Sequence, residues 1–149
     1  MKRLLLIRAE RCIRCRACEV ACAREHGGQS RITVVETECI AWPVSCRHCK
    51  VAPCIHVCYR EAIRYDERDM VIIDENLCTG CGFCELACPF GAITMVEKQK
   101  PSKCDGCQHL VLDGKTPICA LTCPSGAIVY ESIEAYEKQT RISFFSPVR

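Results

Sequence analysis

Cysteine is the residue type of this chain whose number and spacing could do chemistry. The 149 residues include 17 cysteines, far more than an ordinary soluble domain contains. All except Cys39 fall into four blocks of four, in which the first gap is two residues and the last is three. Thiols spaced so closely bind metal or form disulfides, and their spacing helps to separate these alternatives. The blocks are Cys12, Cys15, Cys18 and Cys22; Cys46, Cys49, Cys54 and Cys58; Cys78, Cys81, Cys84 and Cys88; and Cys104, Cys107, Cys119 and Cys123.

The third block has the most specific spacing. The stretch CTGCGFCELACP (78–89) follows the run C-x2-C-x2-C-x3-C-P. In bacterial proteins with two iron–sulfur clusters, the first three cysteines of this run bind one cluster and the fourth binds the other. Zinc usually takes two C-x2-C pairs separated by a spacer, which would leave each block here with a surplus thiol. The spacing therefore favours iron–sulfur clusters over zinc, and both over disulfides.

The start of the chain indicates the compartment. A disulfide framework needs an oxidising compartment. Residues 4–7 are a run of four apolar residues with no small-residue cleavage site after it, so we do not expect a signal peptide. No stretch approaches the roughly 18 consecutive apolar residues of a membrane span. We expect a protein of the reducing cytoplasm with no direct membrane insertion.

Short helices and strands are predicted between the blocks. An Ala-Ile pair recurs after the last cysteine of the second, third and fourth blocks, whereas AREHGG (23–28) follows the first. We expect Gly27 or Gly28 to end a longer helix there, because glycine readily adopts the left-handed conformation. The pattern predicts a small, loop-rich α+β fold. The expected strands are 2–8, 31–38, 92–97, 127–131 and two within 62–74 joined by a turn at 66–69, and a helix at 132–139 begins at Ser132.

The remaining residues suggest neither a catalytic site nor nucleic-acid binding. The chain contains no phosphate-binding glycine loop, no HExxH motif and no carboxylate or Ser/His arrangement typical of hydrolysis. The formal charge is +2, and the basic and acidic residues are interleaved, so no basic patch for nucleic acid is expected. Two insertions, at 50–53 and 108–118, lengthen loops within the second and fourth blocks without changing the final C-x3-C spacing.

On these motifs the chain resembles the four-cluster [4Fe-4S] ferredoxin-like electron-transfer subunits. They occur with dimethyl sulfoxide reductase, formate hydrogenlyase, carbon monoxide dehydrogenase-associated and tungsten aldehyde oxidoreductase systems. The resemblance runs from Cys12 to about Ile128 and departs from the pattern at Ala23 and Tyr59, where proline often follows the fourth cysteine. It implies two nested bacterial-type two-cluster units. One is the central unit, 44–97, and the other is the terminal unit, 1–43 with 98–149, which includes a C-terminal tail.

The resemblance also implies which cysteines share a cluster, and the four sets are named here as ligand groups. In each group, one cysteine comes from a different block from the other three. Ligand group 1 is Cys12, Cys15, Cys18 and Cys123; group 2 is Cys46, Cys49, Cys54 and Cys88; group 3 is Cys78, Cys81, Cys84 and Cys58; and group 4 is Cys104, Cys107, Cys119 and Cys22.

The function implied by this resemblance is electron relay without catalysis. Its partners would be a larger oxidoreductase subunit of the molybdenum, tungsten or nickel type, acting on formate, hydrogen, carbon monoxide or aldehyde, and a second electron carrier. The alternative is a structural or assembly module that uses metal only to hold its fold. Four oxidised [4Fe-4S] centres, at about −2 each with their thiolates, would change the charge of +2 to about −6. We therefore expect the arginines beside the first block to balance this negative charge or to dock an acidic partner. They are Arg8, Arg11, Arg14 and Arg16.

A few further residues carry specific expectations. The four histidines, at 26, 48, 56 and 109, are not expected to bind iron, and His48 is expected to donate a hydrogen bond. Cys39 is expected to be an unligated, partly buried thiol, because a free cysteine packs as a small hydrophobic residue. The adjacent Phe144 and Phe145 suggest a segment that docks on a partner or packs back on its own domain.

Overall fold

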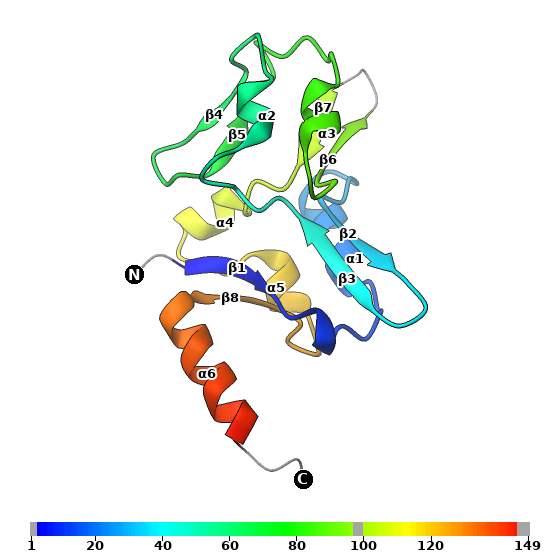
Figure 1. Cartoon of the computed structure of the whole chain (residues 1–149), viewed down its shortest axis with the longest axis vertical. Coiled ribbons are helices and arrows are strands. Elements are labelled where there is room, and N and C mark those ends of the chain that lie inside the picture. The colour runs from blue at the N-terminus through cyan, green and yellow to red at the C-terminus, as the bar shows by residue number, and fades with distance from the viewer. Residues whose placement is uncertain (1–2, 97–99, 146–149) are drawn as a thin grey trace.

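The first and last strands of the chain pair with each other. The computed structural model describes residues 3–96 and 100–145, with side chains as far as residue 141. Strand β1 (Arg3–Ile7) is antiparallel to β8 (Ile128–Ser132), with Arg3 opposite Ser132 and Ile7 opposite Ile128. This pairing lies in the lower half of Figure 1. It brings the first cysteine block, which follows β1, towards the fourth, which precedes β8.

Three more antiparallel strand pairs complete the sheets of the described residues. Strand β2 (Ile32–Glu36) pairs with β3 (Ala41–Ser45), β4 (Ile63–Tyr65) with β5 (Val71–Ile73), and β6 (Ile93–Val96) with β7 (Lys100–Lys103). The predicted strands at 2–8, 31–38, 62–74, 92–97 and 127–131 are confirmed within these bounds. The carboxylate of Asp66 closes the β4–β5 turn by accepting the backbone N–H groups of Arg68 and Met70, at 2.9 and 2.8 Å.

Strands β3 and β7 were not predicted from the sequence. Each contains a proline, Pro43 or Pro101, and proline argues against a central strand because it cannot donate to the ladder. Every strand of a two-stranded sheet is an edge strand, however, so a missing N–H on the outer side costs no hydrogen bond. The prolines are tolerated because the sheets are so small.

The short helices pack in two pairs that hold the cysteine blocks. Helix α1 (Ala17–Glu25) packs on α5 (Ile118–Thr122), and α2 (Pro53–His56) packs on α3 (Phe83–Ala87). Helix α1 is the longest of these. It ends as predicted, with Gly27 at φ +68° and the N–H of Gly28 bonded to the Ala23 carbonyl at 2.7 Å. A 3-10 turn, η1 (Ala9–Arg11), precedes the first block.

The insertion at 108–118 contains a helix rather than only a loop. Helix α4 (Gln108–Leu112) begins directly after Cys107 and ends before Gly114, which has φ +74°. The insertion therefore adds a helical turn between Cys107 and Cys119. Pro117 then precedes the first residue of α5, so the helix that carries Cys119 begins beside a proline, as α2 does at Pro53.

The buried apolar residues form two separate cores, and cysteines belong to both. The central core contains Ala52, Ile63, Val71 and Ile93 together with Cys54 and Cys84. The terminal core contains Ile32, Val34, Ala41 and Ile128 together with Cys18, Cys22 and Cys119. Each core is small, so metal bound to its cysteines would contribute substantially to holding the fold.

The C-terminal helix, α6 (Ile133–Phe145), is capped by Ser132, as predicted, and is longer than the expected 132–139. The N–H of Ala135 donates to the Ser132 hydroxyl at 3.3 Å. Arg8 contacts this helix through a hydrogen bond to Gln139 at 3.2 Å and a position 4.6 Å from the centre of the Tyr136 ring. The docking role predicted for Phe144 and Phe145 concerns side chains outside the described part. Among the described helices, none is long and apolar enough to cross a membrane.

Candidate iron–sulfur sites

The same backbone turn occurs in all four cysteine blocks. The residue directly before the second cysteine has a left-handed conformation in each block: Arg14 (φ 61°), His48 (46°), Gly80 (74°) and Gly106 (70°). This conformation is unfavourable for arginine and histidine and persists only where the surrounding structure imposes it. At Gly106 the turn directs a backbone N–H to the Cys104 sulfur at 3.3 Å. The repeated turn brings successive thiols of a block onto one concave loop.

In ligand group 1, Cys18 lies in α1 and Cys123 directly follows α5, which packs on α1. Burial raises the pKa of the Cys18 thiol to about 11, and the nearby Cys123 thiol adds to this effect. Cys12 and Cys123 pack against the terminal core, whereas Cys15 is exposed to solvent. Cys18 and Cys123, which lie near opposite ends of the sequence, are therefore neighbours in space.

Ligand group 4 is the most deeply buried group. The exposed fractions of Cys22, Cys104, Cys107 and Cys119 are 4%, 8%, 3% and 4%. Burial raises the pKa of Cys104 to about 12 and also raises that of Cys119, which interacts with the other three thiols of the group. Because a metal ligand must be a thiolate, metal binding here must displace protons.

The cysteines of ligand groups 2 and 3 surround the central core. Burial raises the pKa of Cys54, which interacts with Cys46 and Cys88, and Cys49 packs on the same core. The cysteines of group 3 line one pocket, which Gly80 and Gly82 also line. Burial raises the pKa of Cys84 to about 11, with contributions from Cys78 and Cys81, and Cys81 is exposed.

The ligand groups also adjoin one another. Cys119 of group 4 packs in the terminal core with Cys18 of group 1. Lys103, directly before Cys104 of group 4, donates to the carbonyl of Val71, which packs with Cys54 of group 2 in the central core. Groups 2 and 3 share the central core. The thiol groups therefore follow one another through the molecule in the order 1, 4, 2, 3. Groups 4 and 2 are named the inner groups, and groups 1 and 3 the outer groups.

The donor atoms suit iron–sulfur chemistry. Each group offers thiol sulfurs, and backbone N–H groups point at several of them. Such N–H groups tune the potentials of iron–sulfur clusters. The N–H of Arg31 donates to Cys22 at 3.2 Å, and that of Ala92 donates to Cys88 at 3.4 Å. The assignment of each cysteine to a cluster stays a prediction.

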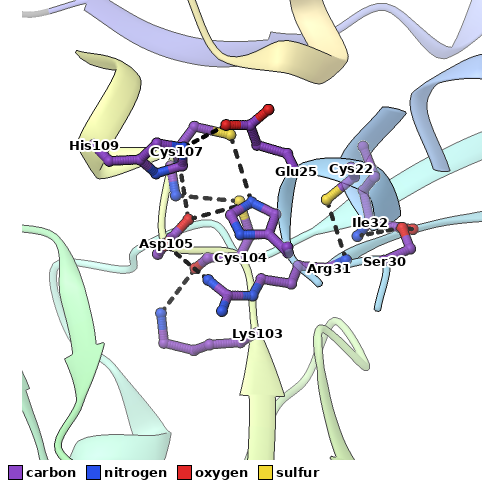
Figure 2. A network of polar contacts seen from close by, with 12 residues as sticks. Cys22, Glu25, Ser30, Arg31, Ile32, Lys103, Cys104, Asp105, Cys107 and His109 are labelled. Carbon is purple, nitrogen blue, oxygen red and sulfur yellow. Dashed lines mark hydrogen bonds and ion pairs between the residues drawn. The ribbon is translucent and has the colours of Figure 1, made fainter. Parts of the chain in front are cut away.

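A polar network beside ligand group 4 was not predicted from the sequence (Figure 2). Arg31 forms a 2.7 Å ion pair with Asp105, and His109 lies 2.7 Å from Glu25. Burial acts to raise the pKa of Asp105, but Arg31 and the other contacts together lower it. Asp105 lies between two cysteines of its block, and this position could have indicated that it lies beside a metal site. Its partner is far away in the sequence and could not have been identified.

His26 also belongs to this network. Its Nε2 lies 3.7 Å from the Cys107 sulfur and 3.9 Å from an Asp105 oxygen. Burial, followed by the charge of Arg31, lowers the pKa of His26. The three side chains could together hold a metal ion, but Cys107 is already part of ligand group 4. His26 is therefore best described as a neighbour of that group.

Two expectations about individual residues are wrong. Cys39 is exposed rather than partly buried, because it lies in the turn between β2 and β3 where the Thr37 N–H bonds the Ile40 carbonyl at 2.8 Å. Arg8 is only 7% exposed and contacts α6, so the expected docking role is wrong, whereas its role as counter-charge stays a prediction. Arg16 is exposed but is paired with Glu19 and Glu36 at 3.4 and 2.9 Å, which reduces the charge left for a partner.

Repeated cysteine turns of this kind define an iron–sulfur protein, and comparison with known families identifies which one. The 4Fe-4S dicluster domain family matches residues 37–133, and a 4Fe-4S binding domain matches residues 9–25. The protein belongs to the 4Fe-4S dicluster domain family. The resemblance identified from the cysteine motifs is therefore confirmed.

Relatives from Escherichia coli (strain K12) match almost the whole sequence. YsaA is 35% identical over 153 residues, covering 93% of this chain and 95% of its own. The B subunit of anaerobic dimethyl sulfoxide reductase is 34% identical, and the match covers 89% of this chain and 75% of the relative. Electron transport protein HydN is 33% identical, with 87% of each chain covered. The prediction of an electron-transfer protein agrees with these names.

Proposed function

We propose that this protein relays electrons through four [4Fe-4S] clusters between a larger catalytic oxidoreductase subunit and a second electron carrier. The observation that supports this proposal is the continuous row of thiol groups. Cys18 and Cys119 pack in one core, and Lys103 bonds the carbonyls of Cys104 and of Val71 in the other core. Metal that served only the fold would not need such a row. The bound clusters would supply one-electron redox chemistry, and the chain holds and insulates them.

The proposal assigns one cluster to each ligand group. Groups 2 and 3 would make residues 44–97 one two-cluster unit, and groups 1 and 4 would make the two ends of the chain the other. The two separate cores and the two helix pairs support this division. The packing of Cys123 on the terminal core, which contains Cys18, supports the exchange of a fourth ligand between distant blocks.

Electrons would enter and leave at the two outer groups. Each contains an exposed cysteine, Cys15 in group 1 and Cys81 in group 3, whereas all four cysteines of group 4 are buried. An exposed apolar side chain lies two residues from each exposed cysteine in the sequence: Ile13 near Cys15 and Phe83 near Cys81, with exposed fractions of 62% and 52%. Partner subunits would cover these ends and exclude water from the transfer path.

The partner would be a molybdenum, tungsten or nickel oxidoreductase. The relative that is the B subunit of dimethyl sulfoxide reductase supports a subunit role. Within this class we propose a formate, hydrogen, carbon monoxide or aldehyde enzyme of the cytoplasm. Affinity purification from the native cell followed by mass spectrometry would identify it, and a protein that purifies alone would contradict the subunit role.

Metal analysis distinguishes this proposal from the structural alternative. Four clusters predict about 16 iron atoms per chain and the brown absorption of iron–sulfur proteins. A metal used only for the fold predicts about four zinc ions and no visible absorption. A Cys81→Ser variant should lower electron flux from a chemical reductant to an acceptor dye, because Cys81 belongs to an outer group. Unchanged flux in that variant would contradict the relay.

A further inference from the structure

Lys103 places a buried positive charge between the two inner ligand groups. It is the last residue of β7, directly before Cys104, and its exposed fraction is 6%. Its ammonium group donates to the carbonyl oxygen of Cys104 at 3.0 Å (Figure 2). It also donates to the carbonyl oxygen of Val71. Val71 is 1% exposed and belongs to the central core, whereas Cys104 belongs to group 4. One side chain thus connects the parts that hold the two inner groups.

The hydrogen bonds of Lys103 within the described residues are to these two neutral carbonyl groups. The ion pairs found in the same part of the chain include no carboxylate bound to Lys103. A buried ammonium group without an anionic partner is costly, and carbonyl dipoles offset only part of that cost. An anion is therefore required nearby. The neighbouring carboxylates of Asp66 and Asp105 are paired with Arg68 and Arg31, which leaves the cluster-bound thiolates of the inner groups as the anions for Lys103. Cys54 of group 2 packs with Val71 in the central core.

His48 contacts the same peptide segment as Lys103. Its Nδ1 accepts the N–H of Val71 at 3.0 Å, so His48 and Lys103 hold the two sides of one peptide segment. Because Nδ1 accepts this N–H, the ring proton belongs on Nε2, which is buried and has no hydrogen-bond partner among the described residues. The predicted donation by His48 would come from this nitrogen, towards an acceptor beside group 2.

We propose that Lys103 is the shared counter-cation of the clusters at the two inner groups and raises their reduction potentials above those of the outer groups. The inference rests on the proposed function. Each cluster gains one electron on reduction, and a fixed positive charge in a buried site favours the more negative, reduced state. Lys103 takes no part in the transfer itself. The outer groups lie farther along the row and at solvent-exposed ends, where the effect is weaker.

The test is a redox titration of the full chain with its clusters, followed by electron paramagnetic resonance. In Lys103→Met, two of the four clusters should shift to lower potential and the other two should not. Lys100→Met is the matched control, because Lys100 is on the same strand and donates to the Glu75 carbonyl. It should leave all four potentials unchanged. Four unchanged potentials in Lys103→Met, or an equal shift of all four, would overturn the proposal.

A second variant decides the case in which Lys103→Met does not assemble. Lys103→Arg keeps the charge, so it should contain four clusters with the native potentials. Loss of clusters in Lys103→Arg, or a fall of two potentials, would overturn the proposal because a cation would still be present. Wild-type protein without about 16 iron atoms would contradict the proposed function instead, so the two failures are distinguishable.

Discussion

The central and terminal cores hold similar cysteine blocks but are closed in different ways. The central core is built from residues 52–93, and its helices α2 and α3 are near each other in the sequence. The terminal core joins residues 5–41 to residues 119–128 through the β1–β8 pairing and the α1–α5 packing. Closing a longer loop costs more chain entropy. The terminal core should therefore depend more on its metal.

Removal of iron is expected to have the largest effect, because it should reveal how differently the two cores depend on their metal. The ligands carry much of the burial in both cores, so chelation under reducing conditions should disrupt both, and the terminal core first. Hydrogen exchange followed by mass spectrometry would show loss of protection in β1 and β8 before β4 and β5. Equal loss in both regions would contradict the comparison.

A matched pair of core substitutions should give an intermediate effect. Ile128→Ala and Ile63→Ala each remove a buried isoleucine, with exposed fractions of 1% and 3%. Each should destabilise the protein by about 2 to 5 kcal/mol, from lost burial and the cavity left behind. Spectroscopy should show that Ile128→Ala weakens retention of the clusters at groups 1 and 4. Ile63→Ala should instead weaken retention of the clusters at groups 2 and 3. The comparison fails if both variants lose the same clusters.

Replacement of the unassigned thiol should have the smallest effect. Cys39 is exposed in the β2–β3 turn, so Cys39→Ser should change neither iron content nor thermal stability measurably. In the loaded wild-type protein, Cys39 should be the thiol most readily alkylated, as peptide mapping would show. A drop in iron content in Cys39→Ser would mean that this cysteine is a ligand.

Local patterns predicted much of the fold. The turn at 66–69, the helix end at Gly27 and Gly28, and the cap at Ser132 were predicted because each depends on residues close together in the sequence. Strands β3 and β7 were missed because their prolines are tolerated only at sheet edges, and the edges follow from tertiary pairing. The burial of Arg8 was missed for a related reason, since α6 covers it from the other end of the chain.

The sequence by itself determined the chemistry of this protein, because cysteine spacing limits which metal centre a short loop can bind. It identified the 4Fe-4S family and the sixteen candidate ligands. Only the tertiary structure decided which thiols of distant blocks are neighbours, and that Arg31 and Asp105 meet beside group 4. It also decided that Lys103 is buried between the inner groups. These contacts join residues far apart in the sequence, so a local sequence pattern could not have predicted that they are close in space.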